Sequence, residues 1–197
     1  LLSNNEGAKI LAGGHSLIPL MKLRLAQPPL VIDIGGIDEL KGISVENGTL
    51  RIGALTTHAE ISESHVVQDA AGILWEAAYG IGDPQVRNRG TIGGNVAENA
   101  GGVHCLKYGL TTNNVLGIEM VLMSGKIVHF GGKHLDSGGY DLLGVATGSE
   151  GLLGVITEVT VRILQKPETA RALLLGFPSN KSAGNCVAAI IGAGIIP

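Results

Sequence analysis

Glycine is concentrated in three short segments that could take part in binding an anion. They read AGGHSL at residues 12–17, TIGGN at 91–95 and GSEGLLG at 148–154, and each lies at the boundary of an expected element. Because glycine has no side chain, its backbone N–H groups can approach a ligand closely and converge on a phosphate. A helix that begins after Ser16 would direct its positive dipole end toward the same group. Together the three segments predict a binding site for a pyrophosphate.

The two familiar nucleotide-binding fingerprints do not occur in this chain. Neither GxGxxG after a strand nor GxxxxGK[ST] is present, so a different nucleotide-binding architecture is expected. Arg87 and Arg89 precede the second glycine segment and would either neutralise phosphate charge or form an exposed pair of cations. Glu98 and Glu150 stand beside glycines and could accept a hydrogen bond from a ribose hydroxyl, but loop carboxylates are usually solvated, and no catalytic role is assigned to them.

Composition excludes several classes of protein. With 45% hydrophobic and 16% charged residues in 197, the chain is expected to fold around a packed core. A net charge of -3 and 3% aromatic residues offer no nucleic-acid surface. Cys105 and Cys186 have no CxxC spacing, which argues against a disulfide framework and favours a reducing cytoplasm. The histidines, among them His129 and His134, match no known metal-ligand spacing, so no metal site is predicted.

The elements that would position the first glycine segment alternate between strands and helices. A strand is expected over residues 8–12, then a helix capped by Ser16 with apolar positions at Leu17, Leu20, Leu23 and Leu25. Residues 30–34 read as a buried strand, and Asn47 and Gly48 predict the turn of a hairpin between strands at 43–45 and 50–55.

Helical spacing of apolar residues over 58–79, broken near 63–65, predicts two helices. Residues 80–109 read as a functional loop rich in Gly, Asn and Pro. Further strands are expected over 115–123, 126–130, 155–164 and 172–177, followed by a helix that begins near Ser179. The apolar tail at 187–196 is too short to span a bilayer and reads as a buried helix. The predicted class is therefore α+β.

Two parts of the chain resemble two families of flavoproteins. Over about residues 8–97 the chain resembles the FAD-binding medium subunit of the molybdenum hydroxylases, through AGGHSLIPLMKLRLAQPPLVIDI and GDPQVRNRGTIGGNVA. Over about residues 91–197 it resembles the D subunit of glycolate oxidase, an FAD-linked oxidase, through TIGGNVAENAGGVHCLKYGLTTNNVLGIEMV and GGKHLDSGGYDLLGVATGSEGLLGVITEVTV. The chain looks like a mosaic joined at the shared TIGGN segment.

Both resemblances imply the same fold, the α+β PCMH-type FAD-binding fold, in which two α/β subdomains hold FAD between them. They imply a first FAD-binding subdomain at residues 1–54, truncated at its N-terminal side, and a second at 55–178. Residues 179–197 would be the start of a truncated C-terminal region.

The resemblance also implies which residues contact FAD. The first segment would wrap the pyrophosphate, the second would form a further phosphate and ribityl loop, and the third would pass the adenine and the flavin ring. FAD would be held non-covalently, because the Arg-Ser-Gly-Gly-His form found where this fold attaches flavin covalently is missing around His15. The implied cofactor-binding residues are Ala12, Gly13, Gly14, His15, Ser16, Leu17, Thr91, Ile92, Gly93, Gly94, Asn95, Gly148, Ser149, Glu150, Gly151, Val155 and Ile156.

The function implied by the resemblance is that of an FAD-binding domain of a flavin-dependent oxidoreductase. Electrons would come either from a 2-hydroxy acid such as glycolate or D-lactate or from molybdenum and iron-sulfur partner subunits, and would pass to an acceptor. No catalytic residue is implied. The alternative is an FAD-binding module without turnover, because the substrate and partner regions of both families are missing from this sequence.

Overall fold

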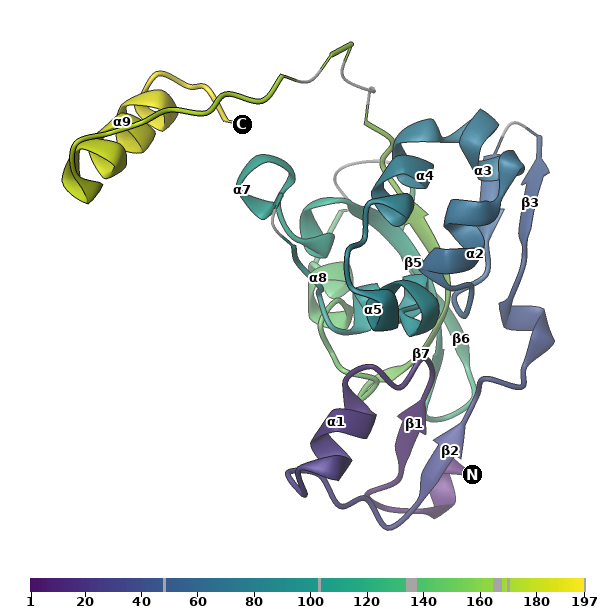
Figure 1. Ribbon diagram of the computed structural model, residues 1–197. Helices are drawn as coiled ribbons and strands as arrows, with labels where there is room; N and C mark the ends of the chain where they lie inside the picture. Colours follow the sequence, from purple (N-terminus) through teal and green to yellow (C-terminus); the bar gives the residue numbers. More distant parts are fainter. Residues whose placement is uncertain (48, 103, 134–137, 165–167, 170, 197) are drawn as a thin grey trace.

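The computed structural model describes residues 1–197 except 48, 103, 134–137, 165–167, 170 and 197. Three small sheets and their helices form the body of the molecule, and the last helix, α9 (Asn180–Gly192), lies apart from that body (Figure 1). Mixed parallel and antiparallel pairing with helices confirms the α+β class. Two residues of the sequence predictions, Gly48 and His134, lie outside the described residues.

The first unit contains a parallel pair of strands and one short helix. After the 3-10 turn η1 (Leu2–Asn4), strand β1 (Lys9–Leu11) pairs in parallel with β2 (Val31–Asp33), and α1 (Leu17–Lys22) connects them. Both strands were predicted, but β2 is only half-buried and ends in an exposed Asp33, so its prediction as a buried strand was wrong.

Helix α1 differs from its prediction at both ends. Ser16 occupies the N-cap position, but its side chain makes no capping hydrogen bond. The helix ends at Lys22, so Leu23 and Leu25 lie beyond it with most of their surface exposed. The apolar spacing predicted a longer helix with a buried face, but no other described residues cover Leu23 and Leu25.

An antiparallel hairpin follows the first unit. The 3-10 turn η2 (Asp38–Leu40) precedes β3 (Ile43–Glu46) and β4 (Thr49–Ile52), with Glu46 opposite Thr49. Asn47 has a φ of 51°, the left-handed conformation that asparagine tolerates well in such turns. The predicted hairpin is confirmed, with a second strand that stops at Ile52 instead of continuing to residue 55.

Three helices, not two, cover residues 58–79: α2 (His58–Glu63), α3 (His65–Ala70) and α4 (Gly72–Tyr79). The predicted break near residue 64 is present, and a second break falls at Ala71, whose φ of -149° is not helical. A core cluster of Ile61, Val67 and Ala78 joins these helices to the hairpin.

Residues 80–109 were predicted as loop, and this prediction was wrong. They contain α5 (Pro84–Arg89), α6 (Ile92–Ala97) and α7 (Cys105–Tyr108). Asp83 and Thr91 cap the first two helices by accepting hydrogen bonds from backbone N–H groups, which offsets the poor helix propensity of the glycines and proline. The loop prediction gave weight to the glycines and overlooked the two N-cap residues.

The central sheet is antiparallel with the strand order β6-β5-β7. After η3 (Thr111–Asn113) come β5 (Val115–Leu122) and β6 (Ile127–Gly131), then α8 (Leu142–Ala146) and β7 (Gly154–Val161). These three strands were predicted. Their buried side chains, with Val96 of α6 and Ala146 of α8, form the second core cluster, in which Met120 is fully buried.

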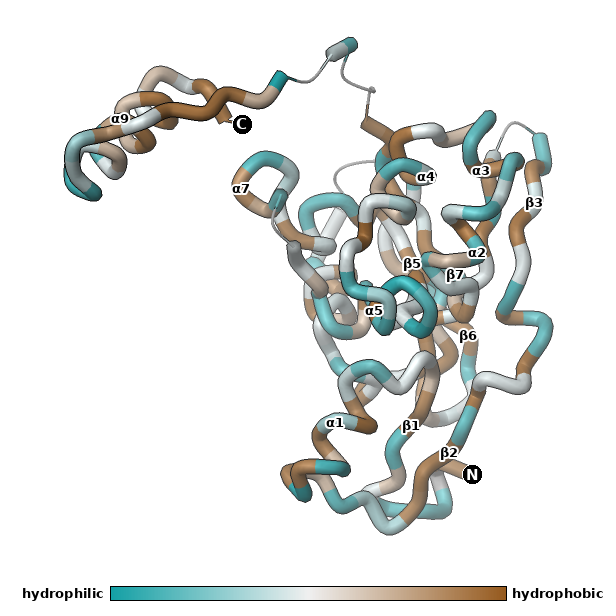
Figure 2. Tube along the Cα trace, in the orientation of Figure 1, coloured by the Kyte–Doolittle hydropathy of each residue, from teal (hydrophilic) through white to brown (hydrophobic). Residues whose placement is uncertain are grey.

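The C-terminal segment departs most from its predictions. No strand forms over described residues 171–177, where Leu174 is fully exposed, because no neighbouring strand pairs with it. Helix α9 begins next to Ser179 as predicted, and the Ser179 side chain caps it. It has no buried residue, so the prediction of a buried helix was wrong. Figure 2 shows apolar colour along this separate segment. Within the described part of the chain, every helix is too short or too polar to span a bilayer.

Candidate functional site

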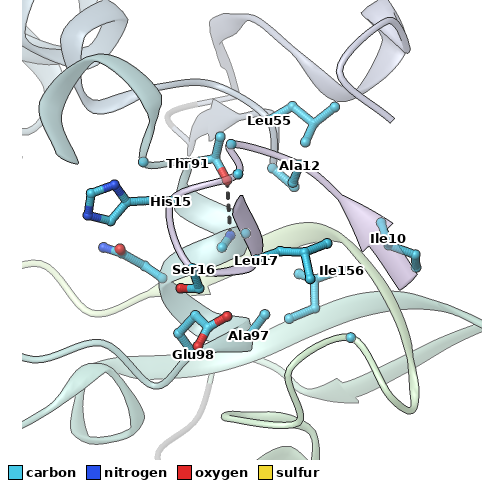
Figure 3. Close-up of a pocket in the computed structure, with 18 of the residues that line it drawn as sticks. Ile10, Ala12, His15, Ser16, Leu17, Leu55, Thr91, Ala97, Glu98 and Ile156 are labelled. Atoms are coloured by element: carbon cyan, nitrogen blue, oxygen red, sulfur yellow. Dashed lines mark hydrogen bonds between the residues drawn. The ribbon is translucent and has the colours of Figure 1, made fainter. Parts of the chain in front are cut away.

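A pocket of about 340 Å³ lies where the three glycine segments meet. The first segment connects β1 to α1, the second begins α6, and the third leads into β7. Figure 3 shows residues of the first segment, Thr91 of the second and Ile156 of β7 around one space, and Glu150, Gly151 and Gly154 of the third segment also line it. The volume is at the lower end of the range of about 300–1,000 Å³ typical of small-molecule sites.

The first glycine loop, residues 12–17, leaves its backbone donors unused. None of the backbone N–H groups of residues 13–17 has an acceptor within hydrogen-bond distance among the residues that the structure describes. Gly14 has a φ of 75°, which a residue with a side chain rarely adopts, and a Cβ at Gly13 would overlap the carbonyl oxygen of Arg89. Consecutive unpaired N–H groups in a turn form a concave site for an anion.

The second glycine loop, residues 91–95, uses its backbone donors within the protein. The N–H of Gly93 donates to the carbonyl of Ala54 at 2.8 Å, and the N–H of Ile92 donates to that of Thr56 at 3.3 Å. The N–H of Gly94 donates to the Thr91 hydroxyl at 3.1 Å, drawn as the dashed line in Figure 3. The loop still lines the pocket through Thr91, Gly93, Gly94 and Asn95, but these backbone donors are already used within the protein.

The third segment is attached to the end of α6. The N–H groups of Gly148 and Glu150 donate to the carbonyls of Val96 and Ala97, each at 2.9 Å. Glu150 has a φ of 53°, an uncommon conformation for a residue other than glycine. The hydroxyl of Ser149 is buried and has no hydrogen-bond partner among the described atoms.

The structure brings most of the predicted site residues together. Those that line the pocket are Ala12, Gly13, Gly14, His15, Ser16, Leu17, Thr91, Gly93, Gly94, Asn95, Glu150, Gly151, Val155 and Ile156. Three predicted residues, Ile92, Gly148 and Ser149, are not among the residues that line it, and Ile92 packs against the helical core cluster instead. The His15 side chain is exposed and points away from Leu17 in Figure 3.

Several lining residues were missed by sequence reasoning. The sequence left the roles of Arg89 and Glu98 open, and both residues line the pocket, whereas Arg87 does not. The remaining missed residues are mostly apolar or glycine: Ile10, Leu11, Ile34, Ala54, Leu55, Val86, Gly90, Ala97, Ala100, Gly101 and Gly154. Ala54 lies at the site because its carbonyl accepts a hydrogen bond from the N–H of Gly93. No pattern in the local sequence predicts a contact between residues so far apart in the chain.

One titratable side chain beside the pocket has a shifted pKa. His58 is 5% exposed, and burial lowers the pKa of its imidazole, while a hydrogen bond to Asn95 opposes that shift. Its Nε2 lies 3.4 Å from Oδ1 of Asn95. The described residues contain no group of three or more His, Cys, Asp and Glu side chains that could hold a metal ion.

Comparison with protein families matches residues 1–114 to the family described as the FAD binding domain in molybdopterin dehydrogenase. The chain is similar to glycolate oxidase subunit GlcD of Escherichia coli (strain K12), with 57% identity over 115 residues, which cover 58% of this chain and 23% of that relative. It is also similar to the carbon monoxide dehydrogenase medium chain of Hydrogenophaga pseudoflava, with 57% identity over 91 residues, which cover 46% of this chain and 32% of the relative. The chain therefore spans a third or less of the length of these curated relatives.

Solved structures agree with these sequence matches. The carbon monoxide dehydrogenase from Hydrogenophaga pseudoflava that lacks the Mo-pyranopterin moiety superposes with a TM-score of 0.56 and 36% identity, covering 83% of this chain and 54% of that chain. An alkyldihydroxyacetonephosphate synthase superposes with a TM-score of 0.65 over 98% of this chain and 36% of that chain, at 19% identity, and shows the fold alone. Both predicted resemblances are confirmed, while the junction at residues 91–95 stays a prediction.

Proposed function

Because this chain belongs to the family of FAD-binding domains in molybdopterin dehydrogenase, we propose that it binds FAD non-covalently in the pocket between its three glycine segments. The fold is the α+β PCMH-type FAD-binding fold, and FAD is the cofactor of the family. We assign the first subdomain to residues 1–54, the second to 55–178 and a separate C-terminal region to 179–197. Residues from both subdomains line the pocket, which supports a cofactor site between them.

The observation that carries this proposal is the row of unpaired backbone N–H groups at residues 13–17. A pyrophosphate would satisfy several of these donors at once. Glycine lets the loop adopt this conformation, because a Cβ at Gly13 would overlap the Arg89 carbonyl oxygen and one at Gly14 would lie 2.6 Å from Ile18. Arg89 also lines the pocket, and its guanidinium would neutralise part of the phosphate charge if it turns toward the ligand. The pyrophosphate of FAD is thus assigned to the first loop.

The second and third segments would bind the rest of the cofactor. Asn95 offers a side-chain amide, and Glu98 and Glu150 offer carboxylates that can accept hydrogen bonds from ribityl or ribose hydroxyls. Val155 and Ile156 provide an apolar wall on which a flat ring can pack. These assignments extend the pyrophosphate site into a continuous FAD site.

The reaction class we propose is flavin-dependent oxidoreduction, in which FAD supplies the redox chemistry and the protein positions it. Similarity to glycolate oxidase subunit GlcD supports a 2-hydroxy acid such as glycolate or D-lactate as electron donor. Similarity to the carbon monoxide dehydrogenase medium chain supports donation from molybdenum and iron-sulfur partner subunits instead. We also propose a cytoplasmic location, in keeping with the free thiols of Cys105 and Cys186.

A visible absorption spectrum of the purified chain, with and without added FAD, tests the cofactor assignment. We expect resolved flavin bands, and colour that stays in the supernatant after acid precipitation, as for non-covalent FAD. A chain that remains colourless and does not change the spectrum of added FAD would overturn the proposal.

Anaerobic addition of glycolate or D-lactate to the FAD-loaded chain then separates the reaction classes. Bleaching of the flavin bands would support direct oxidation of a 2-hydroxy acid. Bleaching only after addition of a reduced molybdenum and iron-sulfur complex would support the partner route. Binding without reduction by either would leave an FAD-binding module without turnover.

A further inference from the structure

His58 is a buried residue that contacts two residues of the pocket lining, Gly90 and Asn95. It is the first residue of α2, and the Thr57 and Glu60 side chains cap that helix reciprocally. Its backbone N–H donates to the carbonyl of Gly90 at 3.1 Å. A Cβ placed at Gly90 would meet the Val86 carbonyl oxygen first and would also come within 3.1 Å of the imidazole ring, so the ring packs against this glycine.

The imidazole of His58 lies within hydrogen-bond distance of the Asn95 side-chain amide. Nε2 of His58 lies 3.4 Å from Oδ1 of Asn95, a long hydrogen bond in which the ring N–H donates and the amide oxygen accepts. Burial favours the neutral ring, and because an amide oxygen can only accept, this bond requires the neutral tautomer that carries its proton on Nε2. The NH₂ group of Asn95 has no acceptor among the described residues, and Asn95 lines the pocket.

We propose that His58 is a positioning residue: it holds the oxygen of the Asn95 amide so that the NH₂ group donates to a hydrogen-bond acceptor of FAD. This inference rests on the proposed function of the pocket. The backbone N–H groups of Ile92, Gly93, Gly94 and Asn95 are already paired, so the side-chain amide of Asn95 is a donor that the second loop can offer to a ligand. Without the imidazole, the amide could rotate and present its oxygen instead.

A double-mutant cycle distinguishes positioning from mere filling of space. FAD titrations, followed by flavin fluorescence, are made on the wild-type chain, His58→Leu, Asn95→Ala and the double variant. We expect His58→Leu to weaken FAD binding about tenfold in the wild-type background, the scale of one lost hydrogen bond, and less than about twofold in the Asn95→Ala background. His58→Gln, which keeps a donor on its side chain, should restore affinity to within about threefold of wild type.

Two controls accompany the cycle. His65→Leu makes the same replacement at an exposed histidine of α3, outside the pocket, and should leave FAD affinity unchanged. Thermal unfolding of each FAD-free variant shows whether it folds. Should His58→Leu fail to fold, the side-chain amide resonances of Asn95, assigned by their loss in Asn95→Ala, are followed in the wild-type chain, where FAD should shift them.

The outcomes separate this inference from the function on which it rests. An affinity loss in His58→Leu that persists in full in the Asn95→Ala background would overturn it, as would wild-type affinity in His58→Leu or amide resonances that FAD does not move. In each of these cases the wild-type chain still binds FAD and the proposed function stands. A wild-type chain that does not bind FAD would overturn both.

Discussion

The two glycine loops on either side of the pocket resemble each other in sequence and differ in what they offer a ligand. Residues 12–17 and 91–95 each contain a glycine pair at the start of a helix: Gly13 and Gly14 precede α1, whereas Gly93 and Gly94 lie in the first turn of α6. The first loop leaves its backbone N–H groups unpaired, whereas the second donates three of them to Ala54, Thr56 and Thr91. A glycine pair in a sequence thus predicts close approach of the backbone, and the neighbouring chain decides whether a ligand or the protein itself occupies the donors.

The difference follows from what lies beside each loop. Residues 54–58 run along the second loop, where Thr57 bridges Thr91 and the backbone groups pair on both sides. The first loop turns into a six-residue helix with no strand beside its N–H groups. We therefore expect the first loop to contribute more to FAD affinity and the second more to stability of the FAD-free chain.

The largest effect is expected for Gly13→Ala. Its Cβ would overlap the carbonyl oxygen of Arg89, and because backbone cannot rotate away as a side chain can, the first loop must shift. FAD affinity, measured by titration, should fall by at least about 100-fold, or roughly 3 kcal/mol. Gly36→Ala is the matched control, since a Cβ there meets nothing within 4 Å. Equal affinity of the two variants would contradict the assignment of the pyrophosphate to the first loop.

A smaller effect is expected for Arg89→Gln. Removing the cation that lines the pocket should weaken FAD binding about tenfold, and the loss should shrink as salt is raised, because salt screens exposed charges. Arg87→Gln removes a charge two residues away that does not line the pocket and should have little effect. Titrations at two salt concentrations check the pair, and similar losses in both variants would show that only net charge matters.

Capping provides the opposite test of the two loops. Thr91→Ala removes a hydroxyl that accepts from Gly94 and should lower the free energy of unfolding of the FAD-free chain by about 1 kcal/mol. Ser16→Ala removes a hydroxyl that makes no capping bond and should change it by less than about 0.5 kcal/mol. Urea unfolding of both variants measures this, and a larger loss in Ser16→Ala would reverse the comparison.

The smallest effect is expected from pH. Burial lowers the pKa of His58 from its usual 6.5, and no charged side chain contributes to that shift. Below pH 6.5 the His58 side chain binds a proton in the unfolded chain but not in the folded chain. The free energy of unfolding should therefore decrease as the pH is lowered from 6.5 to the lowered pKa of the folded chain. Above pH 6.5 this contribution to stability should be fully present. Urea unfolding between pH 5.5 and 7.5, roughly spanning the usual histidine range, should show a shallower slope for His58→Gln. An unchanged slope would mean that other groups cause the dependence.

Much of the fold could be predicted from local patterns. The hairpin around Asn47, the three strands of the central sheet and the helix after Ser179 follow from alternation and turn or cap residues that act within a few positions. The helices of residues 84–97 were missed because glycine and proline outweighed the caps Asp83 and Thr91. The expected strand at 172–177 failed because a strand needs a partner, which its own sequence cannot supply.

The sequence by itself determined where the backbone can approach a ligand, since left-handed φ and close packing at Gly13 and Gly14 demand residues without side chains. Through resemblance it also determined the family and the cofactor. Only the tertiary structure decided which loop keeps its backbone N–H groups unpaired. The N–H groups of the second loop are paired because residues 54–58, about forty positions earlier in the chain, lie beside it. The pairing of His58 with Asn95 arises in the same way, from two segments brought together by backbone hydrogen bonds that no local pattern encodes.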